Sequence, residues 1–251
     1  YEVIGLTMLL CEDEQSTAIK DAKKVCEKLN IEHHVVDLRK EFKKNVVDNF
    51  VCSYMCAKTP NPCVECNKYM KFGAFYKIAQ ELGCEYIATG HYARIKYSEK
   101  YEQVVLAKSN SEKKDQTYFL YGINKEILPK IIFPLSDFED KTEIRKIAEE
   151  NDLVVAKKKD SQEICFIQNN DYISFLQNNE NNIKTKKGKI MLRSGEVLGE
   201  HTGLINYTVG QRKGLGIAYK EPLYVIELDS MKNEVIVGTE NELYNNELEA
   251  D

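Results

Sequence analysis

Residues 1–38 read YEVIGLTMLLCEDEQSTAIKDAKKVCEKLNIEHHVVDL, and this stretch decides the fold class. Residues 1–10 form a short, mostly apolar run with β-branched side chains, which is typical of a buried strand. Residues 16–30 carry apolar side chains on one helical face, with Ser16 as a candidate N-cap, and residues 31–38 again predict a strand. Strand, helix and strand in this order imply parallel strands joined by a right-handed crossover.

The same alternation continues as far as residue 90. Residues 39–58 predict a helix that ends before Pro60, and residues 67–83 predict another helix, with Gly83 as its stop. Residues 84–90 predict a strand. We therefore expect an α/β fold with a doubly wound parallel sheet.

Beyond residue 90 the pattern changes. The two strands of a hairpin and then three helices are predicted at residues 92–97, 101–108, 115–123, 125–132 and 141–152. From about residue 184 onward, short strands alternate with glycine turns, which predicts a small β-rich module. We place a soft domain boundary near residues 160–165, and the polar residues 177–189 predict an exposed linker.

Composition limits the class of protein further. The chain has 251 residues, of which 43% are hydrophobic and 30% charged, so it can bury a sizeable core. It contains no apolar run long enough to cross a membrane, and residues 1–10 lack the features of a signal peptide. We therefore expect a cytoplasmic protein whose eight cysteines are reduced thiols. A net charge of −5 argues against a generic nucleic-acid binder, so any nucleic-acid contact must use local basic patches.

Two cysteines stand three positions apart at a predicted helix start, in the segment TPNPCVECNKYMKFGAF at residues 59–75. Cys63 and Cys66 allow three interpretations. A helix N-terminus favours the thiolate and activates sulfur, two thiolates at this spacing can share a metal or cluster, and two buried cysteines can be inert. A zinc finger is disfavoured because no second ligand pair follows at a suitable spacing. For Cys52 and Cys56, four positions apart, we favour the core face of a helix.

Two further candidates lie at strand-like segments. Cys165 is part of the apolar stretch ICFI, where a buried cysteine is the favoured local interpretation. Gly90 and His91 directly follow a predicted strand. In doubly wound sheets ligands bind beyond the carboxyl ends of strands, so these residues are either ligand contacts or an ordinary turn.

Two charged segments complete the set of candidates. Lys114, Asp115 and Gln116 precede a predicted helix, and the favoured role of Asp115 is that of an N-cap. Arg212 and Lys213 lie among three glycines, which suits phosphate contact or a plain hairpin turn. The order of residues differs from that of a Walker-type loop, so no P-loop is predicted.

Together and in this order, these segments resemble the tRNA 2-thiouridylase family, whose members replace the 2-oxygen of the wobble uridine with sulfur. The matching segments run through nearly the whole chain and are GLTM, TPNPCVECNKYMKFGAF, ATGHYARI, KKDQTYFL, DSQEICFI, LGEHTGL, YTVGQRKGLGIA and EPLYVIELD. The resemblance implies an adenine nucleotide alpha hydrolase-like catalytic domain at residues 1–163. It also implies a central tRNA-binding domain at residues 164–232 and the start of a β-barrel domain at residues 233–251.

The resemblance further implies a chemistry. ATP, with Mg²⁺, adenylates the uridine 2-oxygen so that AMP can leave, and sulfur arrives as a persulfide from a separate sulfur donor. Cys165 matches the cysteine that bears the persulfide and Cys66 matches its partner nucleophile, and the two can close a disulfide as sulfur is released. Met8 and Gly90 match positions that line the ATP pocket.

The implied substrate is the anticodon arm of a tRNA, with the target base flipped toward the thiols. The positions that match family contacts to the target base or to other parts of the tRNA are Asn61, Pro62, Cys63, His91, Lys114, Asp115 and Gln116. We add Arg212 and Lys213 as phosphate contacts. For residues 184–189 a solvated loop is the favoured interpretation.

Two departures from the family pattern matter. The SGG-x-DS loop that binds the pyrophosphate of ATP in this superfamily is absent from the chain, so we expect a fragment that does not turn over ATP alone. AMP release by these residues would contradict this expectation. Cys63 stands where many members have Asp, so Cys63, Cys66 and Cys165 are an alternative ligand set for a [4Fe–4S] cluster. The alternative function is a non-catalytic tRNA-binding or sulfur-relay module that has no nucleotide loop.

Overall fold

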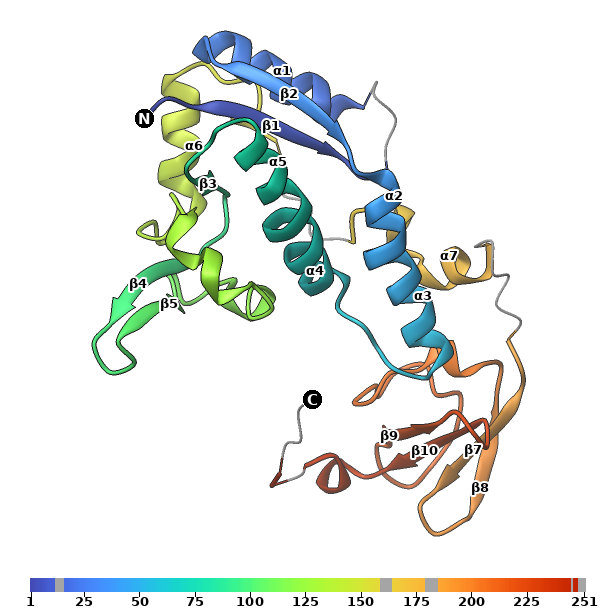
Figure 1. The fold of residues 1–251 in the computed structure, drawn as a ribbon. Helices are drawn as coiled ribbons and strands as arrows, with labels where there is room; N and C mark the ends of the chain where they lie inside the picture. The colour runs from blue at the N-terminus through green and yellow to red at the C-terminus, as the bar shows by residue number, and fades with distance from the viewer. Residues whose placement is uncertain (12–15, 159–163, 179–184, 245, 248–251) are drawn as a thin grey trace. The chain divides into compact units, whose positions relative to one another are not determined.

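The computed structural model describes residues 1–11, 16–158, 164–178, 185–244 and 246–247 (Figure 1). The chain divides into two compact units. Unit 1 comprises Tyr1–Asp48 and Asn61–Ile164, and unit 2 comprises Asn49–Pro60 and Cys165–Asp251. In the part of the chain that is described, no helix is long and apolar enough to cross a membrane.

Unit 1 begins with the predicted strand, helix and strand. Strand β1 (Ile4–Leu9) pairs in parallel with β2 (Glu32–Asp37), and helix α1 (Thr17–Leu29) connects them and packs beside both (Figure 1). The Ser16 hydroxyl accepts a hydrogen bond from the Ile19 amide, as expected of an N-cap. A Cβ atom on Gly5 would lie 2.5 Å from the Cys26 sulfur, so glycine allows α1 to pack this close to β1. The parallel pairing predicted here is confirmed.

A second helical stretch follows β2 and contains α2 (Arg39–Phe42), the π-helix η1 (Lys43–Val47) and α3 (Asp48–Met55). It ends before Pro60, as predicted. In α3 the buried face carries Phe50 and Tyr54, whereas Cys52, and Cys56 just after the helix, are exposed. The core-face interpretation of these two cysteines is therefore wrong, because the larger aromatic residues take the buried face.

The helix that carries the C-x-x-C pair starts earlier than predicted. It consists of α4 (Pro62–Glu65), the π-helix η2 (Cys66–Ala74) and α5 (Phe75–Glu81), and Gly83 follows it at φ +78°. Next comes β3 (Ile87–Ala88), and then β4 (Arg94–Ser98) and β5 (Gln103–Ala107) form the predicted antiparallel hairpin.

The segment after the hairpin departs from the prediction of regular helices. It forms two short 3-10 helices, η3 (Thr117–Phe119) and η4 (Lys125–Lys130), and the strand β6 (Ile131–Ile132), which pairs in parallel with β3. The helix predicted as far as residue 132 is thus wrong at its end. Pro129 cannot donate to a continuing helix, and two β-branched residues follow it. The predicted helix α6 (Lys141–Glu150) is confirmed, with the Asp140 carboxylate accepting from the Thr142 amide at 2.7 Å.

The core of unit 1 joins the C-x-x-C helix to the later segments. Its buried members are Phe72, Ala79, Ile87, Ala93, Leu120, Ile123, Leu128, Ile131 and Phe133. The helix η2 is therefore fixed against residues 120–133, which follow the candidate RNA contacts Lys114, Asp115 and Gln116 in the chain.

Unit 2 contains the predicted β-rich module. Its sheet has the strand order β8-β7-β10-β9, built from β7 (Gly188–Leu192), β8 (Val197–His201), β9 (Tyr224–Asp229) and β10 (Glu234–Gly238). The β7–β10 pair is parallel and the two outer pairs are antiparallel. Of the short 3-10 helices, η5 (Gln168–Asn170) precedes β7, η6 (Leu204–Asn206) follows β8 and η7 (Glu240–Leu243) follows β10.

Unit 2 also holds a helix that the sequence analysis missed, α7 (Tyr172–Asn178). Aromatic rings join it to α3, with Tyr54 stacked on Tyr172 at 5.1 Å between ring centroids. Of the predicted linker, residues 185–187 are exposed, and residues 179–184, including Lys184, lie outside the described part.

Candidate active site

The thiol pair occupies the first turns of a capped helix. Asn61 adopts an extended conformation, and its side-chain oxygen accepts a hydrogen bond from the Cys63 amide at 3.2 Å. Pro62 takes the first helical position, where a missing amide costs nothing. Cys63 is exposed and Cys66, one turn later, is partly exposed. A reagent or substrate can therefore reach this helix start, and the interpretation as two buried, inert cysteines is wrong for this pair.

Cys165 lies in unit 2 and is exposed. Its neighbour Phe166 instead turns into an aromatic cluster, with its ring 5.4 Å from Phe50 and 5.3 Å from Phe175. The segment is a turn and not a strand. The local interpretation of Cys165 as a buried strand cysteine is therefore wrong, because Phe166 is the residue that anchors the segment.

Arg212 and Lys213 belong to a long loop that precedes β9. The strand before it, β8, pairs with β7, and β9 pairs with β10, so the loop joins strands that are not neighbours. A plain hairpin turn is therefore excluded. Gly210, at φ +87°, donates its amide to the Val225 oxygen at 2.8 Å, and Thr208 receives a hydrogen bond from Thr59 at 3.2 Å. These contacts hold the loop against β9 and against Thr59, in the stretch that follows α3.

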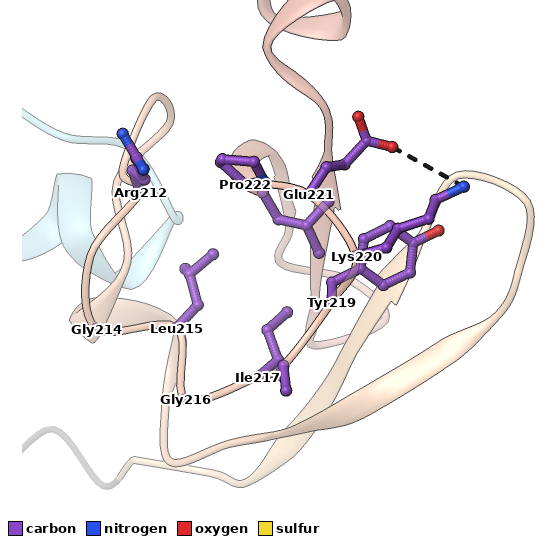
Figure 2. Close-up of a pocket in the computed structure, with 11 residues that line it drawn as sticks. Arg212, Gly214, Leu215, Gly216, Ile217, Tyr219, Lys220, Glu221 and Pro222 are labelled. Atoms are coloured by element: carbon purple, nitrogen blue, oxygen red, sulfur yellow. Dashed lines mark ion pairs between the residues drawn. The ribbon is translucent and has the colours of Figure 1, made fainter.

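A cavity of about 480 Å³ opens beside this loop (Figure 2). Arg212 and residues 214–223 line it, with the apolar side chains of Leu215 and Ile217 along its wall. Lys220 and Glu221 form an exposed ion pair of 3.9 Å at its edge. The cavity thus combines one guanidinium group with an apolar wall and a glycine-rich backbone.

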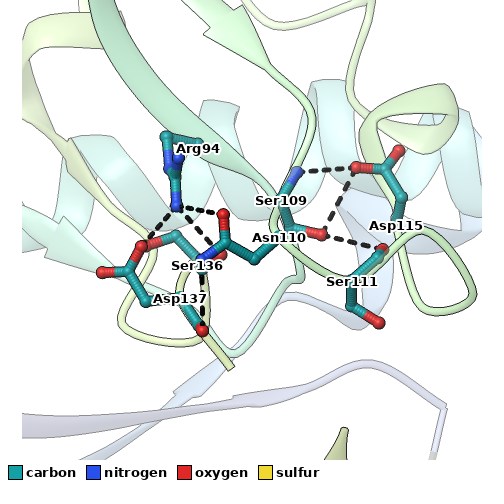
Figure 3. A network of polar contacts seen from close by, with 7 residues as sticks. All are labelled: Arg94, Ser109, Asn110, Ser111, Asp115, Ser136 and Asp137. Carbon is teal, nitrogen blue, oxygen red and sulfur yellow. Dashed lines mark hydrogen bonds and ion pairs between the residues drawn. The ribbon is translucent and has the colours of Figure 1, made fainter. Parts of the chain in front are cut away.

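The segment of the candidate RNA contacts in unit 1 is held by its own side chains (Figure 3). The Asp115 carboxylate accepts hydrogen bonds from the Ser109 amide at 2.8 Å, from the Thr117 amide at 3.1 Å and from the Thr117 hydroxyl. Burial pushes the pKa of Asp115 upward, but these hydrogen bonds outweigh burial and leave the pKa below its usual value. Asp115 therefore stabilises the start of η3, in line with the favoured local role.

The two neighbours of Asp115 differ in what they present to solvent. The backbone of Gln116 donates to the Tyr92 oxygen at 2.8 Å, and its side-chain oxygen accepts from the Tyr92 amide at 2.9 Å. The Lys114 side chain is exposed. Of residues 114–116, it is Lys114 whose side chain projects into solvent.

A second polar network supports the same segment from the other side (Figure 3). Arg94 on β4 donates to the Asn110 side chain at 2.9 Å and to the Ser136 oxygen at 3.4 Å, and it forms an ion pair with Asp137. The residues between the hairpin and η3 are thereby tied to β4 and to residues 136–137.

His91 lies in the interior, with 7% of its surface exposed. Lys71 approaches its Nε2 at 3.3 Å, and Thr89 lies 2.8 Å from its Nδ1. An ammonium group only donates, so Nε2 accepts and Nδ1 carries the proton and donates to Thr89. Burial, and then the Lys71 charge, lower the pKa of His91 to about 3. The imidazole is therefore neutral, and a tRNA contact by His91 stays a prediction.

The two residues predicted to line the ATP pocket both lie in unit 1. Met8 is in β1, opposite Val36, and Gly90 is exposed two residues beyond β3. A Cβ on Gly90 would meet Leu135 at 3.7 Å, an ordinary contact. Their positions suit the rule that ligands bind beyond the carboxyl ends of parallel strands, and their role stays a prediction.

Among the residues that the structure describes, no group of three or more His, Cys, Asp or Glu side chains could hold a metal ion. Within unit 1 the C-x-x-C helix offers two thiols, and a [4Fe–4S] cluster needs three or four protein ligands. The C-x-x-C pair alone is therefore too small a ligand set, and a cluster that adds Cys165 of unit 2 stays a prediction.

Two polar residues near the thiols were missed by the sequence analysis. Asn67 is buried, with 2% of its surface exposed, and Lys71 reaches His91. For Asn67 the sequence does carry a signal. Val64, Asn67 and Met70 are spaced by three along the helix, so Asn67 shares a face with two apolar residues and is expected to be buried with them.

Two family models together match most of the chain. A family model described as the tRNA methyl transferase HUP domain matches residues 1–169. A second model, described as the tRNA methyl transferase PRC-barrel domain, matches residues 174–239. The chain is therefore a HUP-domain protein of the α/β class, with a PRC-barrel domain after it.

Curated relatives define the family more closely. The tRNA-specific 2-thiouridylase MnmA 2 of Clostridium botulinum (strain Loch Maree / Type A3) is 45% identical, over 99% of this chain and 70% of its own length. The tRNA-specific 2-thiouridylase MnmA of Clostridioides difficile (strain 630) is 41% identical, over 99% of this chain and 71% of its own length. The chain belongs to the tRNA-specific 2-thiouridylase family.

Proposed function

We propose that this protein makes 2-thiouridine at the wobble position of tRNA, by ATP-dependent adenylation of the uridine 2-oxygen and transfer of sulfur from a cysteine persulfide. The observation that carries the proposal is an accessible thiol pair on a capped helix in a chain of this family. An exposed Cys165 supports it, because a persulfide must be loaded from outside.

The chemistry follows from the poor leaving ability of the uridine 2-oxygen. ATP converts this oxygen into an adenylate and releases pyrophosphate. The terminal sulfur of a Cys165 persulfide attacks C2 and AMP leaves, so that C2 is joined to Cys165 through two sulfurs. The Cys66 thiolate then attacks the Cys165 sulfur, which forms a Cys66–Cys165 disulfide and frees 2-thiouridine. An external thiol reductant returns the disulfide to two thiols before the next cycle.

We assign the remaining roles by chemistry and position. Asn61, Pro62 and Cys63 face the target base, and Met8 and Gly90 contact ATP, which binds with Mg²⁺. Cys63 cannot act as the carboxylate that many members carry at this position. The persulfide–disulfide route needs no cluster, and a [4Fe–4S] cluster held by Cys63, Cys66 and Cys165 is the alternative to it.

The tRNA is held in part by phosphate contacts. Arg212, Lys213 and the exposed Lys114 supply cations, and an acidic chain needs such local patches. The sulfur donor is a persulfide-bearing protein. The domain limits 1–163, 164–232 and 233–251 and a cytoplasmic location remain predictions.

The proposal is tested in a bacterial strain that lacks its own 2-thiouridylase. The gene that carries this sequence is expressed there, and the 2-thiouridine content of the tRNA is measured. We expect the wild type to restore 2-thiouridine and the variants Cys66→Ser and Cys165→Ser to abolish it. The double variant Cys52→Ser with Cys56→Ser is the matched control, because these exposed thiols have no proposed role.

The same experiment separates the alternative function. A non-catalytic tRNA-binding or sulfur-relay module would bind tRNA or carry a persulfide without restoring 2-thiouridine. Restoration by both single variants would instead contradict the persulfide–disulfide mechanism.

A further inference from the structure

Unit 1 exposes a group of aromatic side chains beside the thiol helix. Tyr69, Tyr118 and Tyr121 are 40%, 69% and 72% exposed, and Lys68 is exposed with them. We call these four residues the tyrosine platform. Large aromatic residues usually bury most of their area, so several exposed rings in one place point to a binding surface.

The rings of the platform are close enough to act together. The centroids of Tyr118 and Tyr121 are 6.4 Å apart, with the ring planes inclined by 60°. The Lys68 ammonium lies 4.8 Å from the centroid of the Tyr69 ring. Hydrogen bonding to Tyr69 raises the pKa of Lys68 and favours its charged form. The platform therefore combines π faces with a cation, which are the two features that unpaired nucleotides need.

The platform is fixed to the helix that carries the thiols. The Asn67 amide group donates to the Phe119 oxygen at 2.9 Å, and Phe119 directly follows Tyr118. A Cβ on Gly122 would meet the Lys68 stem at 3.3 Å, so the stem packs against the chain beside Tyr121. Leu120, between the two tyrosines, is fully buried in the core. The exposed rings are thus anchored to an ordered part of the core, and Asn67, which makes this link, directly follows Cys66 in the chain.

We propose that Tyr118 and Tyr121, supported by Tyr69 and Lys68, stack with unpaired bases of the RNA substrate next to the base that reacts. This inference rests on the proposed function and assigns residues that hold the flanking nucleotides. An anticodon loop supplies unpaired bases, and a flipped target base leaves its neighbours unstacked. Stacking tolerates any base, so the platform positions the loop without selecting its sequence.

The test measures binding of two RNAs to the purified protein, an anticodon stem-loop and a fully paired duplex with the same number of phosphates. We expect Tyr118→Leu with Tyr121→Leu to weaken stem-loop binding roughly 5-fold to 150-fold for each stacked base lost. The corresponding double Phe variant keeps the rings, so its affinity should stay near that of the wild type. Duplex binding should change little in either variant.

A matched control is available in the same unit. Tyr97 and Tyr101 on the β4–β5 hairpin are 62% and 60% exposed, and Lys100 lies 5.0 Å from the Tyr101 ring. Tyr97→Leu with Tyr101→Leu should leave stem-loop affinity unchanged. Circular dichroism and melting temperature confirm that each variant is folded.

The outcomes separate this inference from the function on which it rests. Wild-type thiolation together with full stem-loop affinity in the folded double Leu variant would overturn the platform alone. An equal loss for the stem-loop and the duplex would show a general phosphate surface and would also overturn it. A wild type that binds neither RNA and makes no 2-thiouridine would overturn both proposals.

Discussion

The side-chain nitrogen of Asn67 donates a hydrogen bond to the main-chain oxygen of Phe119 over 2.9 Å, and this bond joins the thiol helix to the segment of residues 114–121. Asn67 is buried, and its side-chain oxygen has no hydrogen-bond partner among the described residues. A polar group held this way is costly to disturb, because a buried group that loses its partner does not regain one from water. The bond therefore fixes the distance between the thiols and the candidate RNA contacts.

The change Asn67→Asp tests this link, because it removes the donor and keeps the shape. It sets a carboxylate against the Phe119 oxygen in the interior, so we expect the free energy of unfolding to fall by about 2 kcal/mol or more at pH 7. Asn151→Asp is the matched control, because the exposed Asn151 donates in the same way to the Ile147 oxygen at 2.8 Å. Chemical denaturation followed by circular dichroism measures both, and equal small losses would contradict the role of Asn67.

The stability of unit 1 should depend on pH through His91. Its folded pKa is about 3 and its ordinary value is 6.5, so between these values the unfolded state binds more protons. Stability from this group is fully present above pH 6.5 and falls as the pH drops toward 3, by at most about 1.4 kcal/mol per pH unit. His91→Gln removes the titrating group, so its unfolding free energy should depend less steeply on pH in this window.

A second variant separates the two causes of the His91 shift. Lys71→Met removes the nearby charge but leaves the ring buried, and burial is the larger cause. Most of the pH dependence should therefore remain. Denaturation curves between pH 4 and pH 7 compare the three proteins, and identical slopes for wild type and His91→Gln would refute the buried neutral imidazole.

The sheet of unit 2 depends on a glycine at the start of β7. A Cβ on Gly188 would lie 2.0 Å from the Asn233 oxygen and 2.5 Å from His201 Nε2, which itself lies 3.1 Å from that oxygen. Gly188→Ala must therefore displace β7 or the turn at Asn233, and we expect it to cost roughly 1–3 kcal/mol, measured as a lower melting temperature. Gly90→Ala, where the nearest contact is ordinary, should leave the melting temperature unchanged.

Local sequence predicted the first half of unit 1 well because its elements are defined by their own spacing. Apolar residues three and four apart marked α1, and Ser16 and Gly83 marked a helix start and a helix stop. Spacing says which residues share a face and not which face is buried, so Cys52 and Cys56 were placed wrongly. The prediction of a buried Cys165 failed for a related reason, because Phe166 takes the buried position in the same apolar stretch.

The parts of the site that the sequence could not supply are contacts between distant segments. Asn67 meets Phe119, and Lys71 meets His91, across separations of 52 and 20 residues. The strand β6 likewise depends on β3, and not on the helical pattern before it. The thiols and residues 114–116 could be picked out from the sequence by residue type. The hydrogen bonds that connect their segments could be seen only in the folded structure.

The loop of Arg212 and Lys213 gives the last prediction, which concerns how salt weakens tRNA binding. Cations that neutralise phosphates release counterions, and each such contact adds about 0.7–0.9 to the slope of log affinity against log salt. Charge reversal by Arg212→Glu with Lys213→Glu should weaken binding across all cognate tRNAs and lower the magnitude of this slope by about 1.4–1.8. Lys220→Glu is the control, because this exposed lysine is already paired with Glu221 at the edge of the same cavity. Filter binding at several salt concentrations measures the slopes. An unchanged slope in the double variant would remove this loop from the tRNA interface, because two phosphate contacts cannot be lost without a change in counterion release.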